Sequence, residues 1–404
     1  MGSGTTTWRE GITSRPGVVA LALLALVLAG CSGGAEGAPG NRPGATSTPA
    51  PPEVTVSITP TAGEQANPKT PIVVKAAKGT LQAVSVTNTA RHTQVKGSLS
   101  ADKTTWTSSE ALGYASDYQV EADGVDAAGR TVHQSQTVHT VKPAAQAFAS
   151  VIPAPNQTDV GVGQVLVVQF DRDITDKAAA EKALQVTSSP AQEGSWYWIS
   201  KRIVHYRPKQ YWQPGTTITL NANIYGVNLG GGVYGQSDRT ITYKVHDSWI
   251  AKADGNTEQM QIFHNGQLVN TMPISMGKDA TPTHVGPHVV SEKHDQYVMD
   301  SCTYGVCQGQ PGWYRSTELW AVRISNDGEF VHENPASVNA QGNSNVSHGC
   351  INLNDANAHW FFDHFGMGDV VEVTNSGGPP LPVWDAYGDW ELPWDQWQKG
   401  SALH

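Results

Sequence analysis

Residues 347–354 read Ser347-His348-Gly349-Cys350-Ile351-Asn352-Leu353-Asn354. A cysteine lies in the middle of this stretch, and a helix is expected directly after it, over residues 355–365, with Asn354 as N-cap and Gly366 as C-cap. The dipole and the amides at a helix N-terminus stabilise a thiolate. Gly349 leaves room for a carbonyl group to approach the backbone amides, which would then form an oxyanion hole.

A histidine precedes this stretch, and the fold could bring it beside the cysteine. His332 lies eighteen residues before Cys350 and follows a predicted strand over residues 330–331. A thiolate nucleophile with a histidine base is the minimal equipment for acyl transfer. The alternative is a buried structural cysteine next to a hydrogen-bonded histidine.

The region around these residues, 248–375, is expected to be a β-rich block with one or two short helices. Asn265-Gly266 lies between two alternating segments, which is a strong hairpin signal. A tail over residues 376–404 contains four tryptophans and is predicted to be a strap docked on this block. Further strands are predicted at 289–291, 296–299, 319–324 and 370–373.

Two blocks that precede residue 248 show short alternating strands with no long helical period. This pattern predicts two antiparallel, immunoglobulin-like sandwiches, over 53–146 and 147–247, so the whole chain is expected to be mainly β. Their aromatic residues are interpreted as core and inter-domain packing, with a glycan-stacking face as the alternative. The predicted elements are strands at 72–75, 81–86, 104–107, 118–122, 131–141, 165–170, 196–199, 203–207, 217–223 and 240–245, and a helix at 176–184.

The N-terminal region is interpreted as a targeting and anchoring segment. Residues 1–30 have the composition of a signal peptide, and they end in Leu28-Ala29-Gly30 before Cys31, which resembles a bacterial lipobox with Cys31 lipidated. Residues 31–52 are nearly all Gly, Ala, Pro, Ser and Thr and predict a disordered tether. The expected location is extracytoplasmic, with a lipid anchor in the outer face of the plasma membrane.

Charge excludes one class of partner. The 404 residues carry 26 Lys and Arg against 36 Asp and Glu, a net charge of −10. Nucleic acids require a basic face, so a nucleic-acid partner is not expected.

The spacing of His332 and the 347–352 stretch resembles the signature of the L,D-transpeptidases. The resemblance covers roughly 248–375, and three other segments strengthen it: 299–305, 312–315 and 388–397. With the lipobox and two sandwiches, the chain is similar to the membrane-anchored, two-immunoglobulin-domain L,D-transpeptidases of the actinobacterial cell envelope.

The resemblance implies a reaction and a set of roles. Cys350 would attack the carbonyl that joins the third residue and D-alanine of a peptidoglycan tetrapeptide stem, and His332 would move the protons. A second stem would accept the acyl group and give a 3→3 cross-link. Carbapenems would be covalent inhibitors, and neither a metal nor a cofactor is required.

The resemblance also assigns the neighbouring residues. Amides near Gly349 and Cys350, with the Tyr314 hydroxyl, would hold the oxyanion. His348, next to Ser347 in the same motif, would orient the catalytic residues rather than act as the base. The substrate would contact Tyr304 and Tyr314 in a lid, Met299 in the floor, and Asp327, Gly328 and Asn352.

Two residues depart from the family pattern. Glu333 follows His332 where a small polar residue is usual, and Ala336 stands where an aromatic residue is common. If the backbone carbonyl of residue 333 orients His332, Glu333 does not abolish activity. Ala336 should widen one wall of the pocket.

Several alternatives remain open. The same acyl-enzyme would serve an L,D-carboxypeptidase or a protein-to-wall ligase, and an inactive domain would leave a wall-binding lipoprotein. A zinc enzyme could use His284, His288 and His294 with His332 and His348, but Pro282, Gly286 and Pro287 forbid the helix that the His284–His288 spacing would need.

Two of the four cysteines remain without an assigned role. Cys31 is assigned to lipid and Cys350 to catalysis, so Cys302 and Cys307 should oxidise in an exported protein, with Gly305 at positive φ in the turn between them. The alternative is two reduced thiols.

Overall fold

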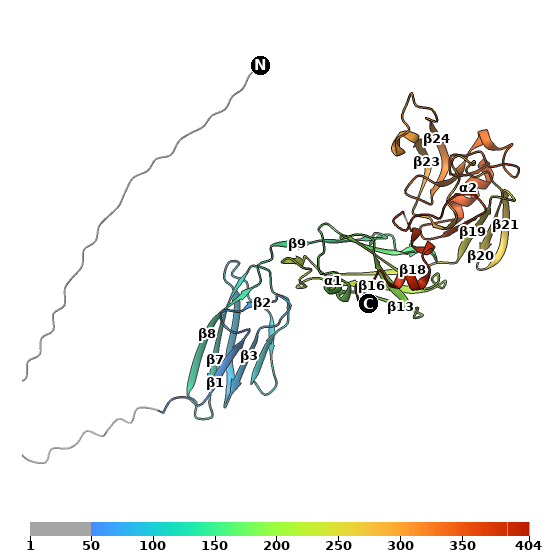
Figure 1. Ribbon diagram of the computed structural model, residues 1–404. Helices are drawn as coiled ribbons and strands as arrows, with labels where there is room; N and C mark the ends of the chain where they lie inside the picture. Colours follow the sequence, from blue (N-terminus) through green and yellow to red (C-terminus); the bar gives the residue numbers. More distant parts are fainter. Residues whose placement is uncertain (1–49, 386, 404) are drawn as a thin grey trace, which may run out of the picture. The chain divides into compact units, whose positions relative to one another are not determined.

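The computed structural model describes residues 50–403 except 386, and it consists mainly of β-strands, as predicted (Figure 1). The signal peptide, the lipidation at Cys31 and nearly all of the tether lie outside the described residues. Within the described range, no helix combines the length and the apolar character needed to cross a membrane.

The first sandwich consists of two four-stranded sheets, in the orders β1-β3-β6-β5 and β2-β8-β7-β4. Alternate residues of both sheets face a shared core that includes Val74, Leu81, Trp106 and Tyr118. Its strands are β1 (Thr55–Thr59), β2 (Gln65–Ala66), β3 (Val73–Ala77), β4 (Thr80–Asn88), β5 (Gly97–Leu99), β6 (Thr105–Ser108), β7 (Asp117–Val125) and β8 (Thr131–Thr140).

The second sandwich has sheets in the orders β10-β12-β15-β14 and β11-β18-β16-β13. The aromatic residues Trp196, Trp198, Tyr206 and Trp212 are buried in its core, which confirms the packing interpretation. Helix α1 (Lys177–Ala183) begins after its N-cap Asp176. The strands are β9 (Ala145–Ala147), β10 (Ala149–Ile152), β11 (Asp159–Val160), β12 (Leu166–Phe170), β13 (Leu184–Ser189), β14 (Gly194–Trp198), β15 (Ile203–Pro208), β16 (Thr217–Ala222), β17 (Val233–Gly235) and β18 (Arg239–Val245), with β9 and β17 paired in parallel.

The third block also has two sheets, in the orders β21-β20-β19-β27-β22 and β23-β24-β25-β26. The predicted hairpin at Asn265-Gly266 joins β20 and β21. The predicted strand at 289–291 is wrong, because the chain leaves one sheet after Val289 and enters the other at Glu292. The strands are β19 (Trp249–Asp254), β20 (Gln259–His264), β21 (Gln267–Pro273), β22 (Gly286–Val289), β23 (Glu292–Asp300), β24 (Arg315–Arg323), β25 (Phe330–Glu333), β26 (Ile351–Leu353) and β27 (Val370–Thr374).

Helix α2 (Asp355–His364) begins at its predicted N-cap, since the Asn354 side chain accepts a hydrogen bond from the Asn357 N–H. It ends one residue early, with Phe365 rather than Gly366 as its C-cap. Strand β26 lies between Cys350 and this helix. Three extended residues span about 10 Å, which exceeds the reach of a helix dipole, so the predicted contribution of the dipole to the thiolate is wrong.

The C-terminal tail contains two short helices, η3 (Gly388–Glu391) and α3 (Trp394–Gln398), and it contacts the second sandwich as well as the third block. Trp390 and Trp397 donate their indole N–H groups to backbone oxygens of the second sandwich, and Asp389 lies 2.7 Å from Nδ1 of His205. On the other side, Asp385 accepts the backbone N–H of Asp327 at 3.1 Å. The predicted docking of the tail on the third block is therefore confirmed, and the second sandwich is an additional partner that was not predicted.

Candidate active site

Two neighbouring strands bring the histidine and the cysteine together. Strands β25 and β26 pair in parallel, with His332 opposite Asn352 and Val331 opposite Ile351. Cys350 ends the turn that enters β26, so it lies beside His332 despite a separation of eighteen residues. The sequence-based expectation that the fold would bring these two residues together is confirmed.

The Cys350 side chain is 7% exposed and packs in a small apolar cluster with Met299, Ala321 and Phe330. Its Sγ lies 3.6 Å from the carbonyl oxygen of Gly328, in the loop before β25. The thiol therefore lies between an apolar wall and a backbone acceptor.

The turn before the thiol is fixed by Ser347 and Gly349. Ser347 Oγ donates to the Cys350 carbonyl at 2.6 Å and accepts the Gly349 N–H at 3.1 Å. Gly349 has φ +126°, a conformation that a residue with a Cβ rarely adopts. Because its N–H is already bonded, Gly349 does not offer the oxyanion amide that was expected. The Cys350 N–H has no hydrogen-bond partner among the described residues and is the amide that remains.

Two acceptors orient His332. Its Nδ1 lies 2.5 Å from the backbone oxygen of Glu333 and 3.5 Å from a carboxylate oxygen of Glu318. Burial lowers the pKa of the His332 imidazole, but its hydrogen bonds to Cys350 and Glu318 outweigh burial and raise the pKa to about 10. The imidazolium form is therefore favoured at neutral pH. The Glu333 side chain is not needed for this orientation, because the backbone carbonyl supplies the contact.

Glu318 was not identified from the sequence. It lies on β24, beside β25, and only 9% of it is exposed. The strand was predicted to begin at Leu319, four residues too late, so the alternation that turns Glu318 inward was not recognised. Burial raises the pKa of Glu318, but hydrogen bonds from His332 and Ser316 outweigh that effect and hold it below its usual range.

We expect Glu318→Gln to narrow the pH range of acylation. The raised pKa means that the His332 imidazolium persists until the pH approaches about 10 and is lost above it. Removal of the Glu318 charge lowers that pKa, so the alkaline limb of the acylation rate should move to lower pH. Glu333→Gln is the matched control, because it retains the backbone carbonyl and removes only a weaker charge interaction with His332, so it should move the limb much less. An unchanged limb in Glu318→Gln would show that Glu318 does not act on His332.

A cavity of about 280 Å³ opens over the thiol. His348, Tyr314 and Asn352 all line it, and Ala336 forms part of one wall. The buried Oδ1 of Asn352 has no hydrogen-bond partner within the described part of the chain, so it is available to a substrate amide. An adjoining cavity of about 200 Å³ shares Met299 and Tyr314 and is lined also by Asp327 and Gly328.

His348 lies at the rim of the first cavity. Its Nε2 is 3.1 Å from the Lys278 ammonium, and its ring is 5.0 Å from that of Tyr314. Burial, and then the Lys278 charge, lower the pKa of His348. The position beside a lysine favours a neutral, orienting role over that of the base.

Cys302 and Cys307 form a disulfide, as predicted, with their Cα atoms 4.2 Å apart. The bridge closes the turn between β23 and β24, where η1 (Ser301–Tyr304) is followed by Gly305 at φ +99°. Tyr304 belongs to this turn, but its side chain lies outside the described part of the structure. Met299 and Tyr314, on either side of the turn, line both cavities.

We expect the double variant Cys302→Ser, Cys307→Ser to retain its fold and to change its acylation rate. A loop this short restricts the unfolded chain little, so the free energy of unfolding should fall by no more than roughly 1–2 kcal/mol. The bridge should act locally by stiffening the turn beside the cavities. Thermal unfolding and carbapenem acylation, measured on the same samples, check both parts. An unchanged acylation rate, or free thiols at both positions in freshly exported protein, would contradict this role.

Comparisons with known proteins agree with this architecture. Residues 63–228 match a bacterial Ig domain, and residues 248–373 match the L,D-transpeptidase catalytic domain. The chain is 43% identical to L,D-transpeptidase 2 of Mycobacterium tuberculosis over 332 residues, which cover 82% of this chain and 81% of that protein. It is 37% identical to L,D-transpeptidase 5 of the same species, over 83% of this chain and 74% of that protein.

A solved structure is similar over more than half of the chain. It is that of the LD transpeptidase LdtMt1 in complex with imipenem, with 34% identity and a TM-score of 0.51. The match covers 57% of this chain and 100% of that one. The catalytic-domain match and the identity to L,D-transpeptidase 2 agree with the sandwich domains and with the paired strands β25 and β26. The chain therefore belongs to the L,D-transpeptidase family.

Proposed function

We propose that this chain forms 3→3 cross-links in peptidoglycan through a thioester on Cys350. The observation that carries the proposal is the pairing of the buried Cys350 thiol with His332, whose pKa is raised to about 10 because its hydrogen bonds to Cys350 and Glu318 outweigh the opposing effect of burial. A thiolate beside an imidazolium is the reactive form of a cysteine nucleophile.

In the first half-reaction, the Cys350 thiolate attacks the carbonyl carbon between the third residue, a diamino acid, and D-alanine of a donor tetrapeptide. The negative charge that develops on the carbonyl oxygen is stabilised by the Cys350 N–H, with Tyr314 at the cavity wall as a second donor. The His332 imidazolium protonates the amine as the C–N bond breaks. D-alanine leaves, and a thioester remains.

In the second half-reaction, the side-chain amine of an acceptor stem attacks the thioester. His332, now neutral, takes the proton from that amine and is ready to pair with the released Cys350 thiolate. No energy source is needed, because the thioester conserves the energy of the original peptide bond. The cavity lined by Asp327 and Gly328 adjoins the thiol cavity, and we propose that the two hold donor and acceptor stems.

Product analysis tests this proposal against its close alternatives. The purified chain would be incubated with a disaccharide-tetrapeptide, and the products identified by mass. A dimer that has lost one D-alanine supports cross-linking. A tripeptide alone indicates an L,D-carboxypeptidase, and no conversion indicates a wall-binding protein. Transfer to an added protein amine, without dimer formation, indicates attachment of proteins to the wall.

Carbapenems are proposed as covalent inhibitors, since the similar protein LdtMt1 was solved in complex with imipenem and Cys350 with His332 would supply the nucleophile and the base here. The strained lactam carbonyl would occupy the position of the stem carbonyl, and Cys350 would open the ring. A chelator should not abolish this reaction, because neither proposed half-reaction passes through a metal.

We also propose that a lipid on Cys31 anchors the chain to the outer face of the plasma membrane, with residues 32–52 as a spacer that lets the domains reach the wall. Cys31→Ala is expected to release the protein from the membrane fraction, because the acyl chains attach through that thiol. Cell fractionation measures this. A variant that still partitions with lipid would contradict lipidation and would identify the apolar run after Val18 as an uncleaved anchor.

A further inference from the structure

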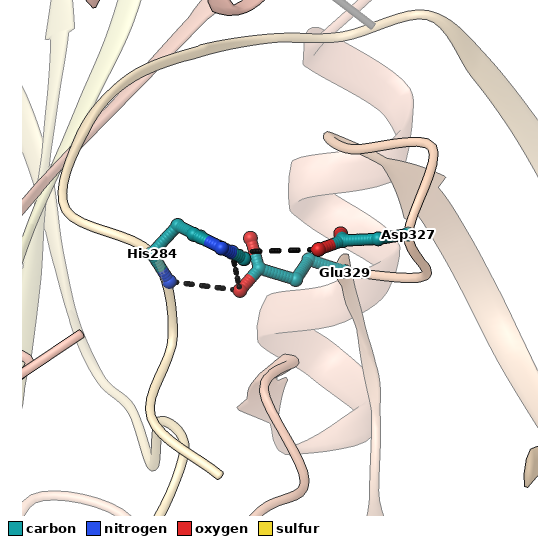
Figure 2. Close-up of side chains that lie close together, drawn as sticks. All are labelled: His284, Asp327 and Glu329. Atoms are coloured by element: carbon teal, nitrogen blue, oxygen red, sulfur yellow. Dashed lines mark hydrogen bonds and ion pairs between the residues drawn. The ribbon is translucent and has the colours of Figure 1, made fainter. Parts of the chain in front are cut away.

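Three side chains from two separate loops converge behind the active-site turn. His284 precedes β22, whereas Asp327 and Glu329 lie in the loop between β24 and β25 (Figure 2). Their ligand-type atoms all lie within 4.8 Å of one another. Among residues 50–403 (386 excluded), no other group of three His, Cys, Asp or Glu side chains converges in this way.

We propose that His284, Asp327 and Glu329 bind a divalent cation of the zinc class. His284 Nδ1 lies 3.1 Å from Glu329 Oε1 and 3.7 Å from Asp327 Oδ2, and Figure 2 shows the imidazole pointing at both carboxylates. A tetrahedral zinc site with bonds of about 2.0–2.2 Å separates its ligand atoms by roughly 3.4 Å, between these two distances. A nitrogen ligand favours zinc or cobalt over magnesium or calcium, which prefer oxygen.

The opposite oxygen of each carboxylate is already held. Asp327 Oδ1 accepts the hydroxyl of Ser325 at 2.5 Å, which leaves Oδ2 for a cation. Glu329 Oε2 lies 3.1 Å from His288 Nε2, and Oε1 accepts the backbone N–H of His284 at 2.8 Å, which keeps Oε1 facing the His284 imidazole. Outer contacts of this kind orient metal ligands and tune their affinity. The group is thus ordered before any cation arrives.

The same loops contact the thiol turn. Gly328, between the two carboxylates, accepts from Cys350 Sγ at 3.6 Å, and Thr283, next to His284, donates its hydroxyl to the Gly349 carbonyl at 2.7 Å. A cation would therefore tie together both supports of the turn. Its role is structural and does not depend on the proposed reaction.

The test uses the full chain with Cys350→Ala, so that the thiol cannot bind metal. Titration with Co²⁺ at about pH 8, chosen because the cation has to displace the Nδ1 proton of His284, should give one cation per chain by calorimetry, with the visible absorption of a low-coordinate nitrogen and oxygen site. His284→Asn and Asp327→Asn, each added to this chain, should weaken binding at least about tenfold.

His133→Asn is the matched control. His133 and Asp123 form an exposed pair at 2.8 Å in the first sandwich, so its removal should not change the titration. Asp327 is 37% exposed, and its replacement should leave the metal-free melting temperature unchanged, which keeps the test valid if His284→Asn unfolds. Equal affinity in the parent and Asp327→Asn chains, or no saturable binding by the parent, would overturn the proposal.

Discussion

Cys350→Ala is expected to abolish both cross-linking and covalent carbapenem adducts. In the proposed reaction the Cys350 sulfur forms the thioester, and no other cysteine among the described residues is free, because Cys302 and Cys307 are bridged. The methyl group of alanine fits the apolar cluster of Met299 and Phe330, so the fold should persist. Intact-mass spectrometry after incubation with a carbapenem measures the adduct directly.

The matched control for this variant is Ser347→Ala. Ser347 supports the turn through its hydroxyl but contributes no nucleophile, so adducts should still form, at a reduced rate. An adduct of normal mass on the Cys350→Ala chain would contradict the assignment of the nucleophile.

His332→Ala is expected to slow acylation by roughly 10²–10⁴-fold, the usual scale of general acid–base catalysis. The loss has two sources. The thiolate loses its imidazolium partner, and the departing amine loses its proton donor. Rapid-mixing kinetics of carbapenem acylation measure the loss of the imidazolium partner. The turnover rate of the tetrapeptide also includes the loss of the proton donor to the departing amine.

His348→Ala separates the two histidines. His348 contacts Lys278 and Tyr314 at the cavity rim, so its removal should have a smaller effect than that of His332. Because His332 is buried and paired with Glu318, His332→Gln provides a second variant that still fills the space and can donate a hydrogen bond to the same acceptors. Wild-type acylation by both His332 variants, with slow acylation by His348→Ala, would reassign the base to His348.

The features predictable from the sequence were those with short-range causes. Asn354 caps α2 because a side-chain oxygen bonds a nearby backbone N–H, and Asn265-Gly266 forms the expected hairpin turn. The pairing of His332 with Cys350 was accessible because the distinctive residues around both positions resemble a known family. The Cys302–Cys307 bridge followed from counting thiols.

The features that were missed depend on long-range placement. Strand β26 is too short to show a period, so the helix was placed directly after Cys350. Glu318 lay outside a strand that was predicted too short. The spacing of His284 and His288 was considered only as a possible pair of metal ligands on a helix. In the structure both histidines contact Glu329, which lies more than forty residues later in the sequence. Tryptophan composition indicated that the tail docks, but could not identify the second sandwich as one of its partners.

The most direct test of the central claim is to trap the acyl-enzyme on its natural donor. The wild-type chain would be mixed with a disaccharide-tetrapeptide in the absence of an acceptor, quenched in acid within the first turnover, digested and mapped by mass spectrometry. The account predicts that the peptide containing Cys350 gains the mass of the donor less D-alanine, and that hydroxylamine removes it. D-alanine release with no acylated peptide, or an acyl group on any other residue, would contradict the account.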